Sequence, residues 1–282
     1  MKKQFVSLFV VILSICGIYT SCTDKMNKTG DFEFEHIQIN KTAHLFGDTT
    51  KPGTNIIIDF TYISESSDNE LKDSLNACIL SACFGDKYAD ENIREIPELY
   101  AQNYISEYRQ DLEPMFTEDQ KNKENDESIA SWYSYYKGVE SRVKFYEKDL
   151  LVYRIDFNEY TGGAHGMYTS IFLNFDLKNM HQLVLDDIFI GDYQNTLSDL
   201  LWNQLMVDQK VKTRTELENM GYGSTGDLIP TENFYLGKEG ITFYYNVYEF
   251  TPYAMGAVEI TLPYVAIEHL MNSTIRRLTI YN

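Results

Sequence analysis

One histidine of this chain lies in a stretch where its chemistry could be put to use. Residues 159–170 read EYTGGAHGMYTS, so Gly162 and Gly163 precede His165 and Gly166 follows it. An imidazole can serve as a general acid or base, or as a metal ligand. Paired glycines, however, supply the positive φ angles that a tight connection between strands needs. We therefore interpret Gly162, Gly163, His165 and Gly166 as a structural motif in which His165 hydrogen-bonds across the turn.

The sequence contains none of the other common catalytic motifs, which favours a protein without an enzymatic centre. The five histidines show no HxH or HExxH spacing, and the sequence has neither a GxSxG elbow nor a phosphate-binding glycine loop. His165 and a carboxylate from Asp156 or Glu159 could in principle join a nucleophile in a catalytic triple, but many such triples arise by chance in any chain. The pair Asp186 and Asp187 favours capping of a helix over cation binding. We predict no catalysis, no metal and no cofactor, with a hydrolase centred on His165 as the alternative.

A second candidate site is the aromatic run SWYSYY at residues 131–136. Trp132, Tyr133, Tyr135 and Tyr136 could stack on sugar rings and form a glycan-binding platform. Side chains alternate between the two faces of a strand, so a strand here would instead turn about half of them into the core. Most of the 22 tyrosines of the chain are expected on half-buried strands for the same reason.

The N-terminus has the pattern of an export signal. Lys2 and Lys3 precede an apolar run at residues 5–19, which is shorter than the roughly 20 residues of a membrane span. A positive start, a short apolar run and small residues after it predict a lipoprotein signal peptide at residues 1–21.

Cys22 is the predicted point of lipid attachment. The text TSC at this position resembles the lipobox of bacterial lipoproteins, although Tyr19 stands where an aliphatic residue is usual. Lipid chains on Cys22 would hold the protein on a membrane without a spanning helix, because each buried methylene contributes about 0.8 kcal/mol. Residues 22–31 are polar and predict a flexible tether. Ordinary secretion with cleavage nearby is the alternative.

The composition argues against one class of partner and favours another. The chain carries 24 Lys and Arg against 42 Asp and Glu, a formal net charge of −18. No basic patch is available to neutralise phosphates, which argues against nucleic acid. The charge would attract a cationic protein ligand, although it would also keep an exported protein soluble. Cys78 and Cys83 are expected to be free thiols, because a helix would separate them beyond the usual reach of a disulfide.

The periodicity of apolar residues predicts the elements that must position these side chains. The expected strands are residues 32–39, 55–63, 130–146, 150–159, 167–177, 233–237, 240–249 and 256–262. The expected helices are residues 69–84, 91–111, 194–210 and 264–271, and the charged run 117–128 is an expected loop. Helices gathered beside runs of strands indicate an α+β fold. We predict antiparallel sheets with helices packed on one face, arranged as two related α/β halves.

Two longer stretches resemble a known group of extracytoplasmic domains. The text YTGGAHGMYTSIFLNFDLKNMHQLVLDDIF is similar to the strand–GGAH–strand pattern of RsiV-like and PdaC-like domains. The later text FYLGKEGITFYYNVYEFTPYAMGAVEITLPY is similar to the second half of that pattern, including its P-Y-x-x-G motif. The resemblance covers most of residues 32–270. It implies a PdaC-like domain at residues 32–180 followed by an RsiV-like domain at residues 181–282.

The same resemblance carries an expectation about function. Such domains form the outer portion of a lysozyme-sensing anti-sigma factor and accompany the catalytic domain of some peptidoglycan deacetylases. We expect neither a cytoplasmic anti-sigma segment nor a deacetylase domain in this sequence. We predict a lipid-anchored binding or sensor-type protein of the bacterial cell envelope, at the outer membrane or cell surface. Its expected ligand is a cationic protein such as a lysozyme, and a glycan is the alternative.

Overall fold

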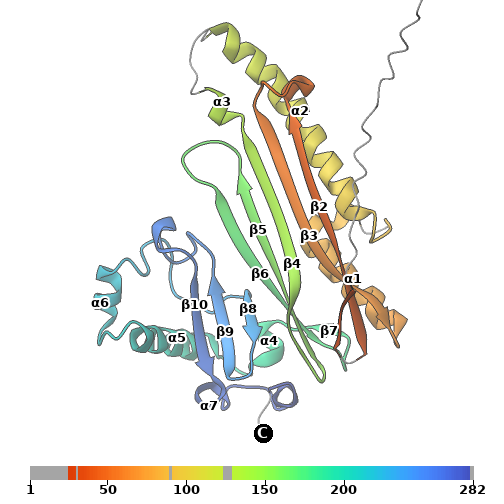
Figure 1. Cartoon of the computed structure of the whole chain (residues 1–282). Coiled ribbons are helices and arrows are strands. Elements are labelled where there is room, and N and C mark those ends of the chain that lie inside the picture. The colour runs from red at the N-terminus through yellow and green to blue at the C-terminus, as the bar shows by residue number, and fades with distance from the viewer. Residues whose placement is uncertain (1–24, 30, 89–90, 123–128, 280–282) are drawn as a thin grey trace, which may run out of the picture.

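The computed structural model describes residues 25–29, 31–88, 91–122 and 129–279 of the 282-residue chain. The predicted signal peptide at residues 1–21 and the predicted lipidation site Cys22 lie outside these described residues. Figure 1 shows a long twisted sheet with two helices along one side and a smaller part, built of helices and strands, beside one end.

Seven strands form the large sheet, and they follow one another in the order of the chain. They are β1 (Lys25–Thr29), β2 (Phe32–His44), β3 (Gly53–Ser66), β4 (Tyr135–Glu147), β5 (Leu150–Tyr160), β6 (Met167–Asp176) and β7 (His181–Gln182). All neighbours are antiparallel except β3 and β4, which run parallel. The α+β class is confirmed, but the sheet is mixed and not purely antiparallel. The helices between β3 and β4 cause this, because they return the chain to the end of the sheet where β3 began.

β1 occupies part of the segment that was expected to be a flexible tether. Its residues Lys25 and Met26 pair with Glu35 and Phe34 of β2. Without β1, that edge of β2 would present unpaired backbone groups, which a short added strand satisfies.

The helix α1 (Asn69–Phe84) has the bounds predicted from the sequence. Its start follows from Asp68, whose carboxylate accepts a hydrogen bond from the Leu71 amide at 3.0 Å. Its end follows from Gly85, which has a φ of 87°. Cys78 and Cys83 on this helix are unbonded, as expected.

The helix α2 (Ile96–Asn122) extends beyond the predicted end at residue 111. Leu112 and Phe116 are buried one turn apart and pack with Tyr108 and Tyr133, so the apolar stripe of the helix continues. Residues 117–122 of the charged run are therefore helical and not a loop. A short helix, α3 (Ile129–Trp132), likewise replaces the start of the strand expected at residues 130–146.

The C-terminal part has its own sheet and core. Its helices are α4 (Leu185–Ile188), α5 (Gln194–Asp208), α6 (Arg214–Asn219) and α7 (Tyr264–Ile267). Its strands β8 (Phe234–Leu236), β9 (Gly240–Tyr245) and β10 (Val258–Pro263) form an antiparallel sheet in the order β10-β9-β8. The short 3-10 helices of the chain are η1 (Leu45–Gly47), η2 (Asp86–Tyr88), η3 (Tyr253–Met255) and η4 (Ile275–Arg277).

Strand β5 belongs to both cores of the molecule. Leu151, Tyr153 and Ile155 face the core beneath α1 and α2. Leu150 and Val152 point the other way and join the core of the C-terminal part, with α5 and β8–β10. The alternation of a single strand therefore joins the two parts. Beyond Val152 on that second face, the side chains of β5 turn polar.

Candidate functional site

The GGAHG stretch connects β5 to β6 and requires its glycines. Gly162 and Gly163 have φ angles of 84° and 93°, which side chains rarely tolerate. A Cβ at Gly162 would also lie 2.6 Å from the carbonyl oxygen of Trp132, so α3 approaches the turn directly. The Tyr160 hydroxyl donates a hydrogen bond to the Gly163 carbonyl at 2.9 Å and holds the turn.

His165 does not brace this turn as the sequence predicted. Its ring is exposed and stacks on Tyr253 of η3, with centroids 5.1 Å apart and planes 17° apart. Within the part of the chain that the structure describes, the ring of His165 makes no hydrogen bond and no ion pair. No carboxylate therefore orients the imidazole, as an adjacent acid does in a catalytic base.

Tyr253 is the centre of a surface cluster that brings two distant motifs together. Its ring lies 5.8 Å from Tyr168 on β6 and 5.7 Å from Tyr248. We call His165, Tyr168, Tyr248 and Tyr253 the aromatic ladder. His165 and Tyr168 belong to the first stretch that carries the resemblance, and Tyr248 and Tyr253 belong to the second, so the two stretches meet in space.

Tyr248 stands in the ladder with an unusual backbone. Its φ is 70°, a left-handed value, and its amide donates to the Thr251 carbonyl at 3.0 Å. Its side chain is nevertheless 46% exposed. A non-glycine residue in this region costs on the order of 1–3 kcal/mol and persists only where its surroundings impose it. The tight turn thus displays a ring that contributes little to the core.

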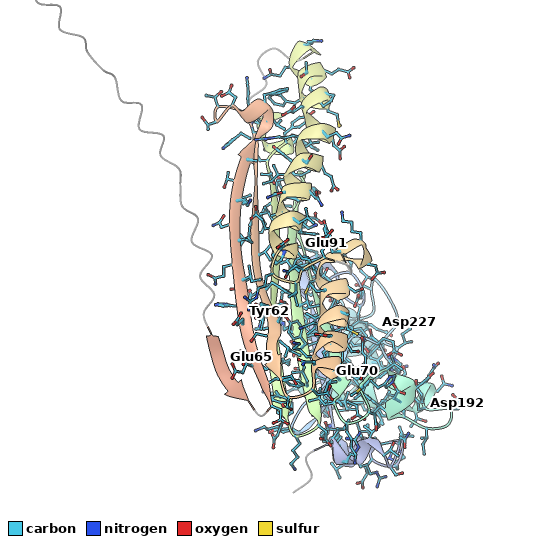
Figure 2. All side chains as sticks on the ribbon, turned by 90° about the vertical axis from the view of Figure 1, so that its right-hand side faces the viewer. Tyr62, Glu65, Glu70, Glu91, Asp192 and Asp227 are labelled. Atoms are coloured by element: carbon cyan, nitrogen blue, oxygen red, sulfur yellow. The ribbon has the colours of Figure 1, made fainter. Side chains whose placement is uncertain are left out.

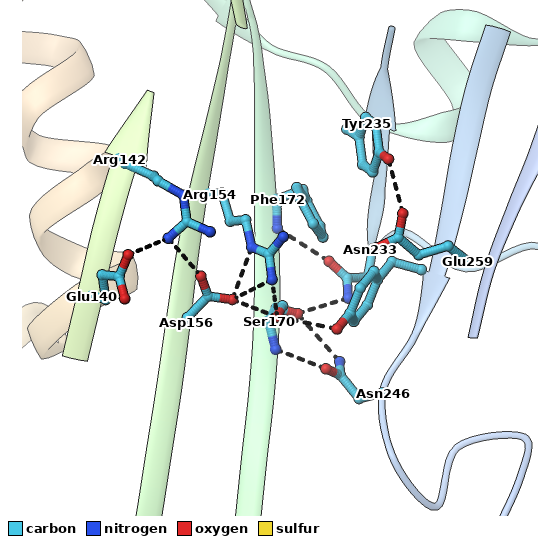
Figure 3. A network of polar contacts seen from close by, with 11 residues as sticks. Glu140, Arg142, Arg154, Asp156, Ser170, Phe172, Asn233, Tyr235, Asn246 and Glu259 are labelled. Atoms are coloured by element: carbon cyan, nitrogen blue, oxygen red, sulfur yellow. Dashed lines mark hydrogen bonds and ion pairs between the residues drawn. The ribbon is translucent and has the colours of Figure 1, made fainter. Parts of the chain in front are cut away.

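Next to the ladder, a polar network joins the large sheet to the C-terminal part (Figure 3). Asp156 accepts hydrogen bonds from Arg154 at 2.8 Å and from the Ser170 hydroxyl at 2.6 Å. It also pairs with Arg142 at 2.9 Å. Partial burial alone would raise the pKa of Asp156, but the bonds from Arg154 and Ser170 and the two positive charges outweigh it and lower the pKa.

Two asparagines of the C-terminal part occupy the outer edge of β6. Asn246 accepts from the Ser170 amide at 2.7 Å and donates to the Ser170 carbonyl at 3.3 Å (Figure 3). Asn233 donates to the same carbonyl at 2.9 Å and accepts from the Phe172 amide at 3.1 Å. These side-chain amides take the place of a neighbouring strand, which satisfies backbone groups that would otherwise lack partners.

Comparison with known proteins places this geometry in a family. The model of DUF3298, described as a protein of unknown function, matches residues 186–265, and the model described as Deacetylase PdaC matches residues 49–168. The crystal structure of a DUF3298 member from Bacteroides fragilis is 60% identical, covers 89% of this chain and 97% of its own, and superposes with a TM-score of 0.84. This chain belongs to the DUF3298 family.

A more distant DUF3298 structure shares the fold. The protein from Pseudomonas aeruginosa is 14% identical, covers 87% of this chain and 97% of its own, and has a TM-score of 0.61. No curated protein matches the chain. The family assignment therefore confirms the resemblance to PdaC-like domains and the fold, and it names no ligand.

The predicted aromatic platform does not form in this DUF3298 member. Trp132 is 63% exposed, whereas Tyr133 is buried and donates to Asp119 at 2.8 Å. Tyr135 packs 5.5 Å from Tyr108 of α2, and Tyr136 extends from the opposite face of β4. The four rings thus point in different directions and offer no common surface.

Two further features are absent from the residues that the structure describes. Among them, no three His, Cys, Asp or Glu side chains gather into a group able to hold a metal ion. No helix in these ranges is both long enough and apolar enough to cross a bilayer.

Sequence reasoning did not identify Tyr248, Tyr253, Asn233 or Asn246 as site residues. The P-Y-x-x-G text containing Tyr253 was the one available signal, and it served only to support the resemblance. Periodicity could not find Asn233 and Asn246, because the tertiary fold alone brings them to their partners on β6. Nothing local in the sequence marks Tyr248 as a ring partner of Tyr253.

Proposed function

We propose that this DUF3298 member is a lipid-anchored binding protein of the bacterial cell envelope that captures a cationic protein, such as a lysozyme, and performs no catalysis. Cys22 carries the anchor in this proposal, and the aromatic ladder forms the contact surface. The match to the model described as Deacetylase PdaC indicates a related domain in this chain, and the proposal includes no deacetylase activity.

The observation that carries the proposal is the ladder, in which His165 and Tyr248 are exposed and Tyr168 and Tyr253 are half-buried. Tyrosines are enriched among the residues that dominate binding energy at protein interfaces, and methionines are enriched at interfaces generally. Met167 and Met255 lie within two residues of ladder members along the chain and are exposed, at 46% and 36%. The strained backbone of Tyr248 supports a binding role, since strain of this kind gathers at functional sites.

The charge of the molecule favours a basic partner. Carboxylates are distributed over both parts, as Figure 2 shows for Glu65 on the sheet, for Glu70 and Glu91 near the helices, and for Asp192 and Asp227 in the C-terminal part. Beside the ladder, Glu249 is exposed and follows Tyr248 directly. An acidic field over the whole surface speeds the encounter with a cationic protein, and the ladder then supplies the short-range contacts.

The test measures binding of hen egg-white lysozyme to the mature chain at low and at physiological salt. We expect saturable binding that weakens with salt, and an affinity at least tenfold lower for Tyr248→Gly and for Tyr253→Ala. Tyr248→Gly removes the ring and relieves the backbone at the same time, so a loss cannot be attributed to unfolding.

The chain offers a matched control. Phe46 also has a left-handed φ, of 57°, and is 51% exposed, but it lies in η1 beside Phe116 and away from the ladder. Phe46→Gly should bind lysozyme like the unmodified chain. Absence of binding at low salt, or equal affinity for Tyr248→Gly and the unmodified chain, would refute the proposal.

A further inference from the structure

One row of side chains crosses the open face of the large sheet in continuous register. Asn40 of β2 pairs with Ile57 of β3, Ile57 with Gly138 of β4, Gly138 with Asn158 of β5, and Asn158 with Tyr168 of β6. We call these five residues the uncharged row. Residues paired directly across strands project their side chains to the same face, so the row is one line on one surface.

The helices leave this face uncovered. Ile56 and Ile58, on either side of Ile57 in β3, are fully buried in the core beneath α1 and α2. Ile57 points away from that core and is 38% exposed, and Asn40 and Asn158 are exposed with it. An exposed isoleucine between exposed amides contributes little to folding.

The row offers hydrogen-bonding groups without charge. The Asn158 amide makes no hydrogen bond within the described residues, and Asn40 uses only its oxygen, which accepts from Asn55 at 2.9 Å. Each amide therefore keeps donors for a ligand. Gly138 at the centre is buried under the Tyr136 side chain, because a Cβ there would lie 2.9 Å from the Tyr136 hydroxyl and 3.5 Å from the Asn158 Cβ.

The neighbouring row sets the charge of the ligand. It pairs Asp59 with Glu140 and Glu140 with Asp156, and so places three carboxylates beside the uncharged row. Arg142 pairs with Glu140 and Asp156, and Arg154 pairs with Asp156, so the neighbouring row strongly attracts neither an anion nor a cation. Free amides, an apolar patch and a terminal tyrosine ring suit the hydroxyls and apolar faces of a sugar.

From this arrangement we infer that the uncharged row is a binding site for a neutral oligosaccharide whose chain runs across the strands. Five strands about 4.8 Å apart give the row a length of about 19 Å, enough for a short oligosaccharide. This site takes a different ligand from the ladder and shares only Tyr168 with it, at the end of the row.

A neutral glycan array probed with the labelled mature chain tests the site, followed by calorimetry with the best neutral hexasaccharide and with an anionic oligogalacturonate. We expect saturable binding of the neutral glycan, and an affinity at least tenfold lower for Ile57→Lys and for Asn158→Ala. Val207→Lys adds the same charge at another exposed aliphatic residue of the molecule and should bind normally. Thermal melts of all three variants establish that they are folded.

The results distinguish a neutral glycan from an anionic glycan and from a protein ligand. The inference is overturned if no neutral glycan binds, if the galacturonate binds more tightly, or if Ile57→Lys binds like Val207→Lys. Loss of lysozyme binding in Ile57→Lys together with an empty glycan array would assign this face to a protein ligand and would also overturn it. The ladder variants are measured with lysozyme alone, so neither proposal decides the other.

Discussion

The two faces of the large sheet use the same strands for opposite purposes. On the helix-covered face, Tyr153 and Ile155 of β5 are fully buried beneath α1 and α2. On the other face, Asp156 and Asn158 of the same strand enter a charged network and an open, uncharged row. The difference shows that one strand can stabilise the fold with alternate residues and leave the others free for recognition, because consecutive side chains point to opposite faces.

The covered face also buries polar groups. The Tyr153 hydroxyl is buried, donates to the Thr61 carbonyl, and lies 2.8 Å from the Ser141 hydroxyl. Burial raises the pKa of Tyr153 well above its usual range. On the open face, by contrast, the amide of Asn158 remains available to solvent.

The largest expected effect compares two residues of β5. Ile155→Ala should lower the free energy of unfolding by about 2–5 kcal/mol, because it leaves a cavity in the covered core. Asn158→Ala should change it by no more than about 0.5 kcal/mol. Urea denaturation of both variants measures the contrast, and similar values for the two would mean that the faces do not differ as described.

A smaller effect is expected where the open face meets the C-terminal part. Asn246→Ala leaves the Ser170 amide without its partner, whereas the Ser170 carbonyl keeps its bond from Asn233, and the change should cost about 1–3 kcal/mol. Hydrogen exchange should show faster exchange at the Ser170 amide and little change at Ile155. Unchanged protection at Ser170 would show that Asn246 does not replace a strand there.

The polar network should make stability depend on pH. The pKa of Asp156 is lowered in the folded protein, so its contribution is present above its unfolded value, near 3.8, and is lost as the pH falls through the folded pKa. Asp156→Asn should therefore flatten the loss of stability below about pH 4. Thermal melts between neutral and acidic pH measure this, and parallel curves for both proteins would contradict it.

The smallest effect on stability is expected in the ladder. Tyr248→Gly should leave stability unchanged or raise it by up to about 1 kcal/mol, because glycine accepts the left-handed backbone. Phe46→Gly should behave similarly in a thermal melt. A loss of several degrees in Tyr248→Gly alone would mean that the Tyr248 ring supports the fold and is not reserved for a ligand.

Much of the fold could be predicted locally. The period of apolar residues placed α1 at its observed bounds, because Asp68 and Gly85 mark its ends within the chain itself. Strands β4 and β5 were also predicted, and they pair antiparallel on either side of one tight turn. The extent of α2 was underestimated, because the burial of Phe116 depends on Tyr133, which is remote in sequence.

The sequence by itself determined the charge, the α+β class, the glycine-dependent turn and the family resemblance, because each depends on composition or on neighbours along the chain. Only the tertiary structure decided what His165 does, since its partner Tyr253 lies in another part of the sequence. It alone decided which residues form the uncharged row, because strand register depends on pairing between distant segments. Local chemistry thus specified the elements, and long-range packing specified the surfaces.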